Sequence, residues 1–490
     1  MKNIILILFI LFQTSVSAQT YFFNKLFKPD TMNIGSPACL TVEDGYLVAS
    51  TYNTLNDLKG FGVQKLDFEG NTKWFQHLDL GPETHAMVGG GILSKTLDNK
   101  YILVGSKDTI GIDGNLDIVM IKFDSDGNVI WKKTQGTDET VEGIYHISPT
   151  QDGGYILCGI QRSFTSNNHF YILKTDALGN KIWDKVLHED KKGVAFTIEE
   201  AYDSGYITSG YVRYPDTKAD MYVAKLSENG VLEWEKNYFV TPETDMAAKI
   251  TKWKDNKYLL TGGVQENNNI KMYNAQLDIL GNEEWEQIHS LQDGNFLQAR
   301  PVILADGFVS SAYWFSSSGE YNVKLMRFDN LGNLVWHNSI PDTNPDEDWY
   351  LKDIALAVDG GYILSGFNYS TQSSWVVKTD SLGHTCSTMG CDSLAFATSV
   401  QELVLNNSSF KISPNPAQDV VQLSWQNKSL FNSKNYEIRL FDAFGILVKK
   451  EKINNTNASF NISDLENGIY FCQLFKEKEL LGTEKMMVLH

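Results

Sequence analysis

The chain has 490 residues, of which 42% are hydrophobic and 21% are charged. This composition allows a large folded core, and it excludes a disordered polyelectrolyte. The formal net charge is −18, because 60 acidic residues outnumber 42 basic ones. Such a chain repels phosphate backbones and anionic lipid surfaces, so no nucleic-acid partner is expected. The length suits one large domain together with a smaller one.

The first residues have the pattern of a secretory signal peptide. Lys2 precedes an apolar run at residues 4–12, and small residues stand just before the Ala18–Gln19 bond. A positive start, an apolar run and a small-x-small site predict a signal peptide over residues 1–18, cleaved between Ala18 and Gln19. The run of nine apolar residues is too short to span a hydrocarbon core of roughly 30 Å. We therefore expect an exported chain with no transmembrane segment.

One nine-residue phrase is repeated along the chain. Residues 328–336 read FDNLGNLVW, and five similar phrases precede them, each ending in tryptophan. The six tryptophans are separated by 57, 52, 51, 51 and 51 residues. They are Trp74, Trp131, Trp183, Trp234, Trp285 and Trp336. A second phrase, DGGYILCGI at residues 152–160, recurs upstream of each tryptophan, and a further copy at residues 359–367 follows the last one. The chain therefore contains seven units.

Each unit is predicted to form four antiparallel strands, because short apolar and β-branched runs alternate with Gly, Asn and Asp. In the nine-residue phrase, Asp-x-x-Gly-Asn predicts a hairpin turn in which Gly takes a positive φ. The tryptophan then lies on the strand that leaves the turn and faces a neighbouring unit. A four-stranded unit cannot bury both faces alone, so the units pack radially. The sequence predicts an all-β chain with a seven-bladed β-propeller over residues 19–386.

The two ends of the repeat region predict how the ring closes. The seventh unit ends at residues 375–386 without its tryptophan strand, whereas residues 20–27 precede the first unit. Phe22 and Phe23 align near the tryptophan position, so the N-terminal strand is expected to complete the last blade and remove an open sheet edge. The repeat as a whole resembles the DGGYILxG repeats of bacterial exported propellers.

The composition changes after the last unit. Residues 387–408 are rich in Ser, Thr and Asn and have no turn–strand pattern, which predicts a linker. In residues 409–490, apolar positions alternate between Gly-centred turns. This pattern predicts a small antiparallel β-sandwich.

Residues 409–490 closely resemble the C-terminal sorting domain of the type IX secretion system. The matching positions are Pro414, Asn415 and Pro416 after an apolar strand, a turn at Gly445, and Gly468 with Tyr470 in the phrase DLENGIYFCQL. The resemblance implies a Gram-negative cell, Sec export, and passage across the outer membrane through the type IX machinery. It implies a secreted or surface-attached protein and assigns the tail no catalysis.

The cysteines and histidines do not predict a cofactor site. Cys386 and Cys391 are close enough in sequence to form a disulfide in an oxidising compartment, although their spacing does not require one. Cys158 is expected to be a small core residue. The nine histidines form no close pair, so no metal site is predicted. No cofactor motif and no catalytic nucleophile is recognised, and we assign no catalytic residue.

One weak pattern predicts a ligand site. Thirteen residues before the Tyr or Phe of each second phrase lies the loop that enters a unit, and such loops converge at one mouth of a propeller's channel. Five of these positions are candidate ligand-binding residues, expected on exposed loops: Asn33, Glu142, Asp245, Asn295 and Trp349. An acidic mouth suits a cation or a sugar. The alternative is that loops before strands are polar everywhere.

Two functions remain open from the sequence. The first is an exported binding or adhesion propeller whose partner is a glycan or another surface protein. The second is an extracellular glycan hydrolase or lyase that uses two channel carboxylates as acid and base. Binding is the favoured hypothesis, because no catalytic constellation is visible.

Overall fold

The computed structural model shows strands and turns, with no helix in the ranges that it describes. These ranges are residues 19–27, 32–54, 59–79, 92–108, 116–137, 139–163, 167–213, 218–267, 269–290, 295–315, 321–340, 349–368, 373–386, 391–396, 410–425, 436–442, 447–453, 457–465, 468–476 and 479–489. The predicted signal peptide and Ala18 lie outside them. The chain divides into two units, one up to residue 397 and one from residue 398 onwards.

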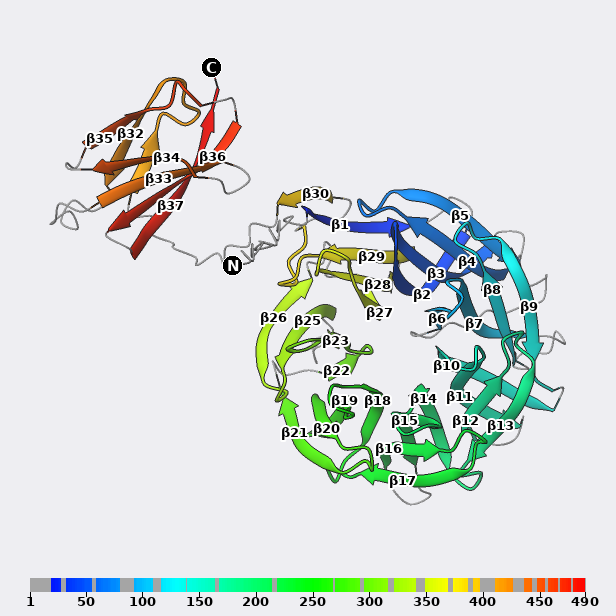
Figure 1. Cartoon of the computed structure of the whole chain (residues 1–490). Helices are drawn as coiled ribbons and strands as arrows, with labels where there is room; N and C mark the ends of the chain where they lie inside the picture. Colours follow the sequence, from blue (N-terminus) through cyan, green and yellow to red (C-terminus); the bar gives the residue numbers. More distant parts are fainter. Residues whose placement is uncertain are drawn as a thin grey trace, which may run out of the picture. The chain divides into compact units, whose positions relative to one another are not determined.

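Seven antiparallel sheets form the first unit and are arranged radially as the blades of a propeller (Figure 1). In each blade the first strand lies next to the central opening, and the fourth lies outermost in every blade except the seventh. Blades one to four comprise β2 (Met32–Val42), β3 (Gly45–Thr54), β4 (Lys59–Leu66) and β5 (Thr72–Asp79); β6 (Leu93–Lys95), β7 (Tyr101–Asp108), β8 (Leu116–Phe123) and β9 (Val129–Gln135); β10 (Thr140–Pro149), β11 (Tyr155–Ser163), β12 (His169–Thr175) and β13 (Lys181–Leu187); and β14 (Lys192–Glu200), β15 (Tyr206–Arg213), β16 (Ala219–Leu226) and β17 (Leu232–Tyr238).

The remaining blades follow the same order, with two variations. Blades five to seven comprise β18 (Asp245–Lys252), β19 (Tyr258–Glu266), β20 (Asn269–Leu277) and β21 (Glu283–His289); β22 (Asn295–Gln298), β23 (Val302–Leu304), β24 (Gly307–Phe315), β25 (Tyr321–Asp329) and β26 (Leu334–Ile340); and β27 (Trp349–Leu356), β28 (Tyr362–Asn368), β29 (Ser373–Thr379), β1 (Gln19–Phe27) and β30 (Cys391–Phe396). The innermost strand of blade six is split into β22 and β23, which both pair with β24. Blade seven takes one strand from the N-terminal end and one that follows the last repeat.

The N-terminal strand completes blade seven. β1 pairs antiparallel with β29 in the register that puts Phe23 opposite Lys378. In blade three, Trp183 stands opposite Lys174 in the same way, so Phe23 occupies the tryptophan position of the repeat. β30 then pairs with the other edge of β1. The linker expected over residues 387–408 is therefore corrected at its start, because Cys391–Phe396 form a fifth strand of this blade.

The repeated phrase joins each blade to the next. At the turn of blade four, Gly230 has a φ of 75°, and a Cβ built there would lie 2.9 Å from the indole ring of Trp183 in blade three. The Trp183 Nε1–H donates to the Glu228 carbonyl of the same turn at 3.1 Å. At the closing interface, Gly70 of blade one approaches Phe23 in the same manner. The phrase recurs because each of these interfaces needs a turn that a neighbouring aromatic ring can cover.

An ion pair between a buried base and, in most cases, an exposed Asp lies beside this turn in six blades, and it is not among the features predicted from the sequence. A basic residue on the third strand, two positions before the turn Asp, bonds an Asp in the first hairpin of its own blade. The pairs are Lys65–Asp44, Lys122–Asp98, Lys174–Asp152, Lys225–Asp203, Arg327–Asp306 and Lys378–Asp359. In blade five Gln276 replaces the base and donates to Glu284 at 2.6 Å. The repeated base is therefore part of the blade framework.

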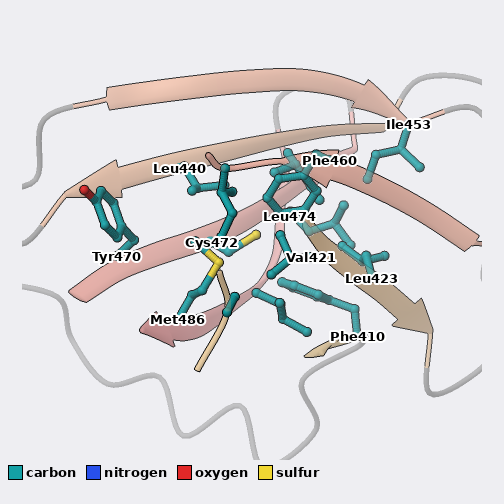
Figure 2. Close-up of a cluster of buried hydrophobic side chains, with 14 of the residues drawn as sticks. Phe410, Val421, Leu423, Leu440, Ile453, Phe460, Tyr470, Cys472, Leu474 and Met486 are labelled. Carbon is teal, nitrogen blue, oxygen red and sulfur yellow. The ribbon is translucent and has the colours of Figure 1, made fainter. Parts of the chain in front are cut away.

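The second unit is a small two-sheet sandwich. One sheet contains three strands and the other four: β31 (Phe410–Ser413), β32 (Val420–Trp425) and β35 (Asn457–Asn461); and β34 (Leu447–Ile453), β33 (Tyr436–Asp442), β36 (Gly468–Lys476) and β37 (Glu479–Val488). Side chains from both sheets meet in one apolar core, including Phe410 and Phe460 from the first and Leu440 and Cys472 from the second (Figure 2). Alternating apolar positions on each strand place one face of each sheet in this core.

Candidate functional site

The predicted mouth residues do not form an exposed acidic rim. Glu142 on β10 is 1% exposed and Asp245 at the start of β18 is fully buried. Asn33 and Asn295 lie near the starts of β2 and β22, and Trp349 begins β27, but their side chains are outside the described set. The expectation that Glu142 and Asp245 are exposed is therefore wrong. Ligand binding by these five residues remains a prediction.

Both buried carboxylates are held by hydrogen bonds within their own blade. The Asp245 carboxylate accepts bonds from the Thr241 hydroxyl at 2.8 Å and from the Val240 N–H at 2.9 Å, so it orders the loop that enters blade five. One Glu142 oxygen accepts from the Gln161 side chain at 3.0 Å. Burial raises the pKa of both carboxyl groups. These contacts indicate that the two residues support the loops, since a buried carboxylate is favourable only when it is hydrogen-bonded.

The innermost strands are irregular at one common level. Extra residues interrupt the pairing at Tyr145 in blade three, Phe196 in blade four and Lys352 in blade seven. A β-bulge of this kind frees a backbone N–H and redirects a side chain. In three interfaces, a side chain of one blade faces the N–H of the next. His146 Nδ1 faces the Ile198 N–H, Thr197 accepts the Ile250 N–H, and Asp353 accepts the Cys39 N–H across the closing interface.

Arg300 connects four blades around the channel axis. It lies in the break between β22 and β23, and its Nη1 atom is 3.0 Å from His146 Nε2 of blade three. Its Nη2 atom pairs with Glu199 of blade four and lies 3.2 Å from the Thr251 hydroxyl of blade five. Blades three and six lie on opposite sides of the central opening (Figure 1). The guanidinium group therefore extends across the channel and ties its two sides together.

The environment of His146 keeps its ring neutral. The imidazole is 2% exposed, and its two nitrogens lie 3.3 Å from the Ile198 N–H and 3.0 Å from Arg300. A neutral ring has one accepting nitrogen, so it accepts from one of these two donors and not from both. Burial lowers the His146 pKa well below its usual value, and the charge of Arg300 lowers it further. A proton on this ring would be placed beside a fixed positive charge, so His146 is suited to accept a hydrogen bond and not to carry a charge.

Glu199 is the counterion of Arg300. The carboxylate is 7% exposed and accepts further hydrogen bonds from the Thr251 hydroxyl at 2.7 Å and the Lys252 N–H at 3.1 Å. Both of its oxygens are thus engaged. Arg300 itself keeps 39% of its side-chain surface exposed, so one face of the guanidinium remains open to the channel.

Two lysines lie at the same level. Lys249 of blade five and Lys352 of blade seven occupy the innermost strands, and each is partly exposed. Protein atoms surround Lys249 on most sides, and part of its side chain stays accessible to solvent. This is expected of a side chain that lines a channel. Burial lowers the pKa of Lys249 to about 8; the charge of Asp353 favours its protonated form, whereas the charges of Lys352 and Arg300 disfavour it. Burial also lowers the pKa of Lys352.

Asp353 is an acidic residue that directly follows Lys352 in the sequence. Burial raises its pKa to about 6, against hydrogen bonds from the Cys39 and Ile354 N–H groups at 3.2 and 3.0 Å. Its side chain accepts hydrogen bonds from backbone donors of blades one and seven, so its main role is to join these two blades. Among the described side chains named at this level, the partly exposed charges are therefore cationic.

Aromatic rings lie on the opposite side of the ring from Lys352. Tyr145 and Phe196, the bulge residues of blades three and four, pack edge to face with centroids 5.7 Å apart. Tyr211 continues this cluster at 5.9 Å from Phe196. All three rings are partly exposed. The channel level defined by Arg300 thus carries an aromatic wall on blades three and four and cationic groups on blades five to seven.

A separate cavity lies between blades three and four. Its volume is 510 Å³, and Trp183, Tyr202, Lys174 and Glu200 are among its lining residues. Some of its polar groups are already bonded within blade three or between blades three and four. Lys174 bonds Asp152 at 2.8 Å, and Glu200 accepts the Gln151 N–H at 2.8 Å. We interpret this cavity as the open end of a blade interface.

The remaining predictions about chemistry concern cysteines and metals. Cys386 is disulfide-bonded, whereas Cys39, Cys158 and Cys472 are free and buried. The side chain of Cys391 is outside the described set, so its pairing with Cys386 remains a prediction. Within the described ranges, no group of three or more His, Cys, Asp or Glu side chains is placed to hold a metal ion, and no helix could cross a bilayer.

The predicted sorting residues that the structure describes lie partly on the surface and partly in the core of the sandwich. Pro414, Asn415 and Pro416 are exposed in the turn after β31, and the Asn415 side chain accepts the Met487 N–H of β37 at 2.9 Å. Gly468 begins β36. Tyr470 is 7% exposed in the core, at the edge of the cluster shown in Figure 2. The predicted turn at Gly445 is outside the described residues. Recognition through these residues remains a prediction.

Comparison with known proteins identifies the tail. Residues 411–489 match the family described as the secretion system C-terminal sorting domain. This match marks the chain as a cargo of type IX secretion and as a secreted or cell-surface protein of a Gram-negative bacterium. No curated protein matches the chain.

Solved structures offer only distant likenesses. A protein of unknown function from Bacteroides caccae has 13% identity over 57% of this chain and 90% of its own, with a TM-score of 0.37. A prolyl endopeptidase has 12% identity over 81% of this chain and 54% of its own, with a TM-score of 0.46. PorZ, a surface component of the type IX secretion system of Porphyromonas gingivalis, has 9% identity over 91% of this chain and 69% of its own, with a TM-score of 0.32. At these scores the likenesses carry no functional argument.

Proposed function

We propose that the chain is an exported binding module, delivered by type IX secretion, whose propeller takes its ligand at the channel level defined by Arg300. The observation that carries this proposal is the composition of that level. Partly exposed cationic groups and aromatic rings come from five different blades. Ligand sites typically combine apolar walls with a few convergent polar groups. A glycan or a surface protein that bears one fits this arrangement.

The alternative, a glycan hydrolase or lyase, needs two carboxylates that face the substrate roughly 5–10 Å apart. The pKa of Asp353, raised to about 6 by burial, lies in the range that suits a general acid. However, Asp353 accepts two backbone N–H bonds, and Glu199 is bound by Arg300, Thr251 and the Lys252 N–H. Both carboxylates are thus committed to the framework, which favours binding over catalysis.

A glycan array tests this proposal. The mature chain, residues 19–490, is applied as folded protein and, as a control, after thermal unfolding. We expect the folded protein alone to retain a chemically related subset of glycans, and the soluble forms of these glycans to compete. Incubation of the retained glycans with the protein is then followed by chromatography. Absence of any specific retention, or release of shortened or unsaturated products, would contradict a binding function.

A further inference from the structure

We propose that the channel level defined by Arg300 selects saccharides that carry a carboxylate, with Lys249 and Lys352 binding the acidic group and the rings of Tyr145 and Phe196 contacting the sugar face. This inference rests on the proposed binding function and names its ligand class. It departs from the sequence-based expectation of an acidic mouth that binds cations.

The charges argue for an anion. Arg300 is 39% exposed beyond its bond to Glu199, and Lys249 and Lys352 are partly exposed on the innermost strands. The acidic groups beside them are buried, Glu199 at 7% and Asp353 at 8% exposure. An incoming ligand therefore meets positive side chains, while the negative ones are covered. Ammonium and guanidinium groups form their strongest hydrogen bonds with anionic oxygens.

The mutual repulsion of the bases supports the same conclusion. The pKa of Lys249 falls to about 8, mainly because of burial; the charge of Asp353 opposes this shift, and the charges of Lys352 and Arg300 add to it. A carboxylate placed among these groups would offset that repulsion, so the protonated lysine and the anion stabilise each other. The chain carries a net charge of −18, which disfavours anions at most other surfaces. A local cationic site would thus make the channel selective for anionic ligands.

The aromatic wall argues for a sugar in place of a small anion. Tyr145, Phe196 and Tyr211 form a continuous cluster, with centroid distances of 5.7 Å for the edge-to-face pair and 5.9 Å for the tilted pair. These residues are partly exposed on blades three and four, whereas Lys249 and Lys352 belong to blades five and seven. A small anion would use only the bases, whereas a sugar acid has an apolar ring face as well as a carboxylate. The two walls together match such an amphipathic ligand.

Isothermal titration of the mature chain tests the inference with three probes: a trimer of galacturonic acid, the uncharged trimer of galactose, and succinate. We expect the acidic trimer to bind at least tenfold more tightly than either comparison ligand, and its affinity to fall as salt is added. Equal binding of the galactose trimer would leave the proposed binding function intact and overturn its acidic specificity. Equal binding of succinate would contradict the proposal that the ligand is a saccharide. Failure of all three probes, with other glycans retained on the array, would overturn this inference alone.

Variants locate the site. Lys249→Met and Lys352→Met should each weaken binding of the acidic trimer by about tenfold or more, because each removes a charge-assisted hydrogen bond. Phe196→Leu keeps apolar volume. It should weaken binding of the acidic trimer several-fold without changing the affinity for succinate. The matched control is Lys254→Met, which removes the same charge from an exposed turn outside the channel. Circular dichroism confirms that each variant is folded. Wild-type affinity in a folded Lys249→Met, Lys352→Met double variant would overturn the assignment.

Discussion

Arg300 of blade six and His146 of blade three are 154 residues apart in sequence, and their Nη1 and Nε2 atoms lie 3.0 Å apart inside the ring. The contact joins opposite sides of the propeller. It also brings a permanent positive charge against a buried imidazole, so the pair depends on the imidazole staying neutral. The stability of the ring is therefore linked to both the charge balance and the pH of this level.

The Arg300–Glu199 pair should contribute measurably to stability. Arg300→Met leaves a largely buried carboxylate without its counterion, and we expect a loss of about 2–4 kcal/mol in the free energy of unfolding. Adding Glu199→Gln should recover part of that loss, because the stranded charge is removed. The control is Arg213→Met, an exposed site at the end of β15. Denaturant unfolding measures the wild type, both single channel variants, the double variant and the control. Additive effects of the two channel changes would show that the pair is not coupled.

His146 should make the propeller sensitive to mild acid. Its folded-state pKa lies well below the usual value, so below about pH 6.5 the unfolded chain takes up a proton that the folded ring does not. The contribution of His146 is present above that pH and is lost as the pH falls, by up to about 1.4 kcal/mol per pH unit. Asp353, with a raised pKa of about 6, acts in the opposite sense, and therefore the wild type must be compared with His146→Gln. The stability difference between these proteins should shrink from pH 7 to pH 5. A constant difference would contradict the assignment.

Ring closure should depend more on Phe23 than other interfaces depend on their tryptophans. Phe23 is fully buried, and Phe23→Ala should cost roughly 3–5 kcal/mol. Trp183 is only partly buried, so Trp183→Ala should cost less, about 1–3 kcal/mol, although it removes more atoms. Thermal melting of both variants provides the comparison. A larger loss for Trp183→Ala would mean that the closing interface contributes less than an ordinary one.

Two glycines separate backbone strain from packing. Gly230 and Gly360 have positive φ angles of 75° and 80°. A Cβ at Gly230 would lie 2.9 Å from the Trp183 ring, whereas nothing lies within 4 Å at Gly360. Gly360→Ala should therefore cost only the left-handed backbone penalty of about 1–2 kcal/mol. Gly230→Ala should cost more, because the Trp183 ring must also move. Equal melting temperatures would show that the aromatic contact tolerates a methyl group.

Residues 409–490 should act only as a secretion signal. Deleting residues 409–490 removes the sandwich with its own core. The melting temperature of the propeller should stay the same, and the protein should accumulate in the periplasm. Fractionation with immunoblotting measures the location, and the full-length chain is the control. Normal amounts of the truncated protein outside the cell would contradict this role.

The repeat and the tail could be predicted from the sequence because they depend on local chemistry. The Asp-x-x-Gly-Asn turns, the spacing of the tryptophans and the position of Phe23 are all visible in the linear chain. Prediction of the sheets, of their number and of closure by β1 follows from these. The ion pairs also leave a signal in the sequence, since Lys or Arg stands two residues before the turn in six units. This signal does not predict the ion pairs, because a repeated base could equally be a solvated surface charge.

The channel was decided only by the tertiary structure. His146, Glu199, Thr251 and Arg300 come from four blades, their residue types differ and their offsets from the repeat phrase are not all the same, so they form no linear motif. The sequence pattern instead selected Glu142 and Asp245 for their polarity, and a polar residue type does not reveal whether its side chain is buried against its own loop. Residues about fifty positions apart become neighbours only when the blades close into a ring, and the bulges on the innermost strands then determine which side chains reach the axis.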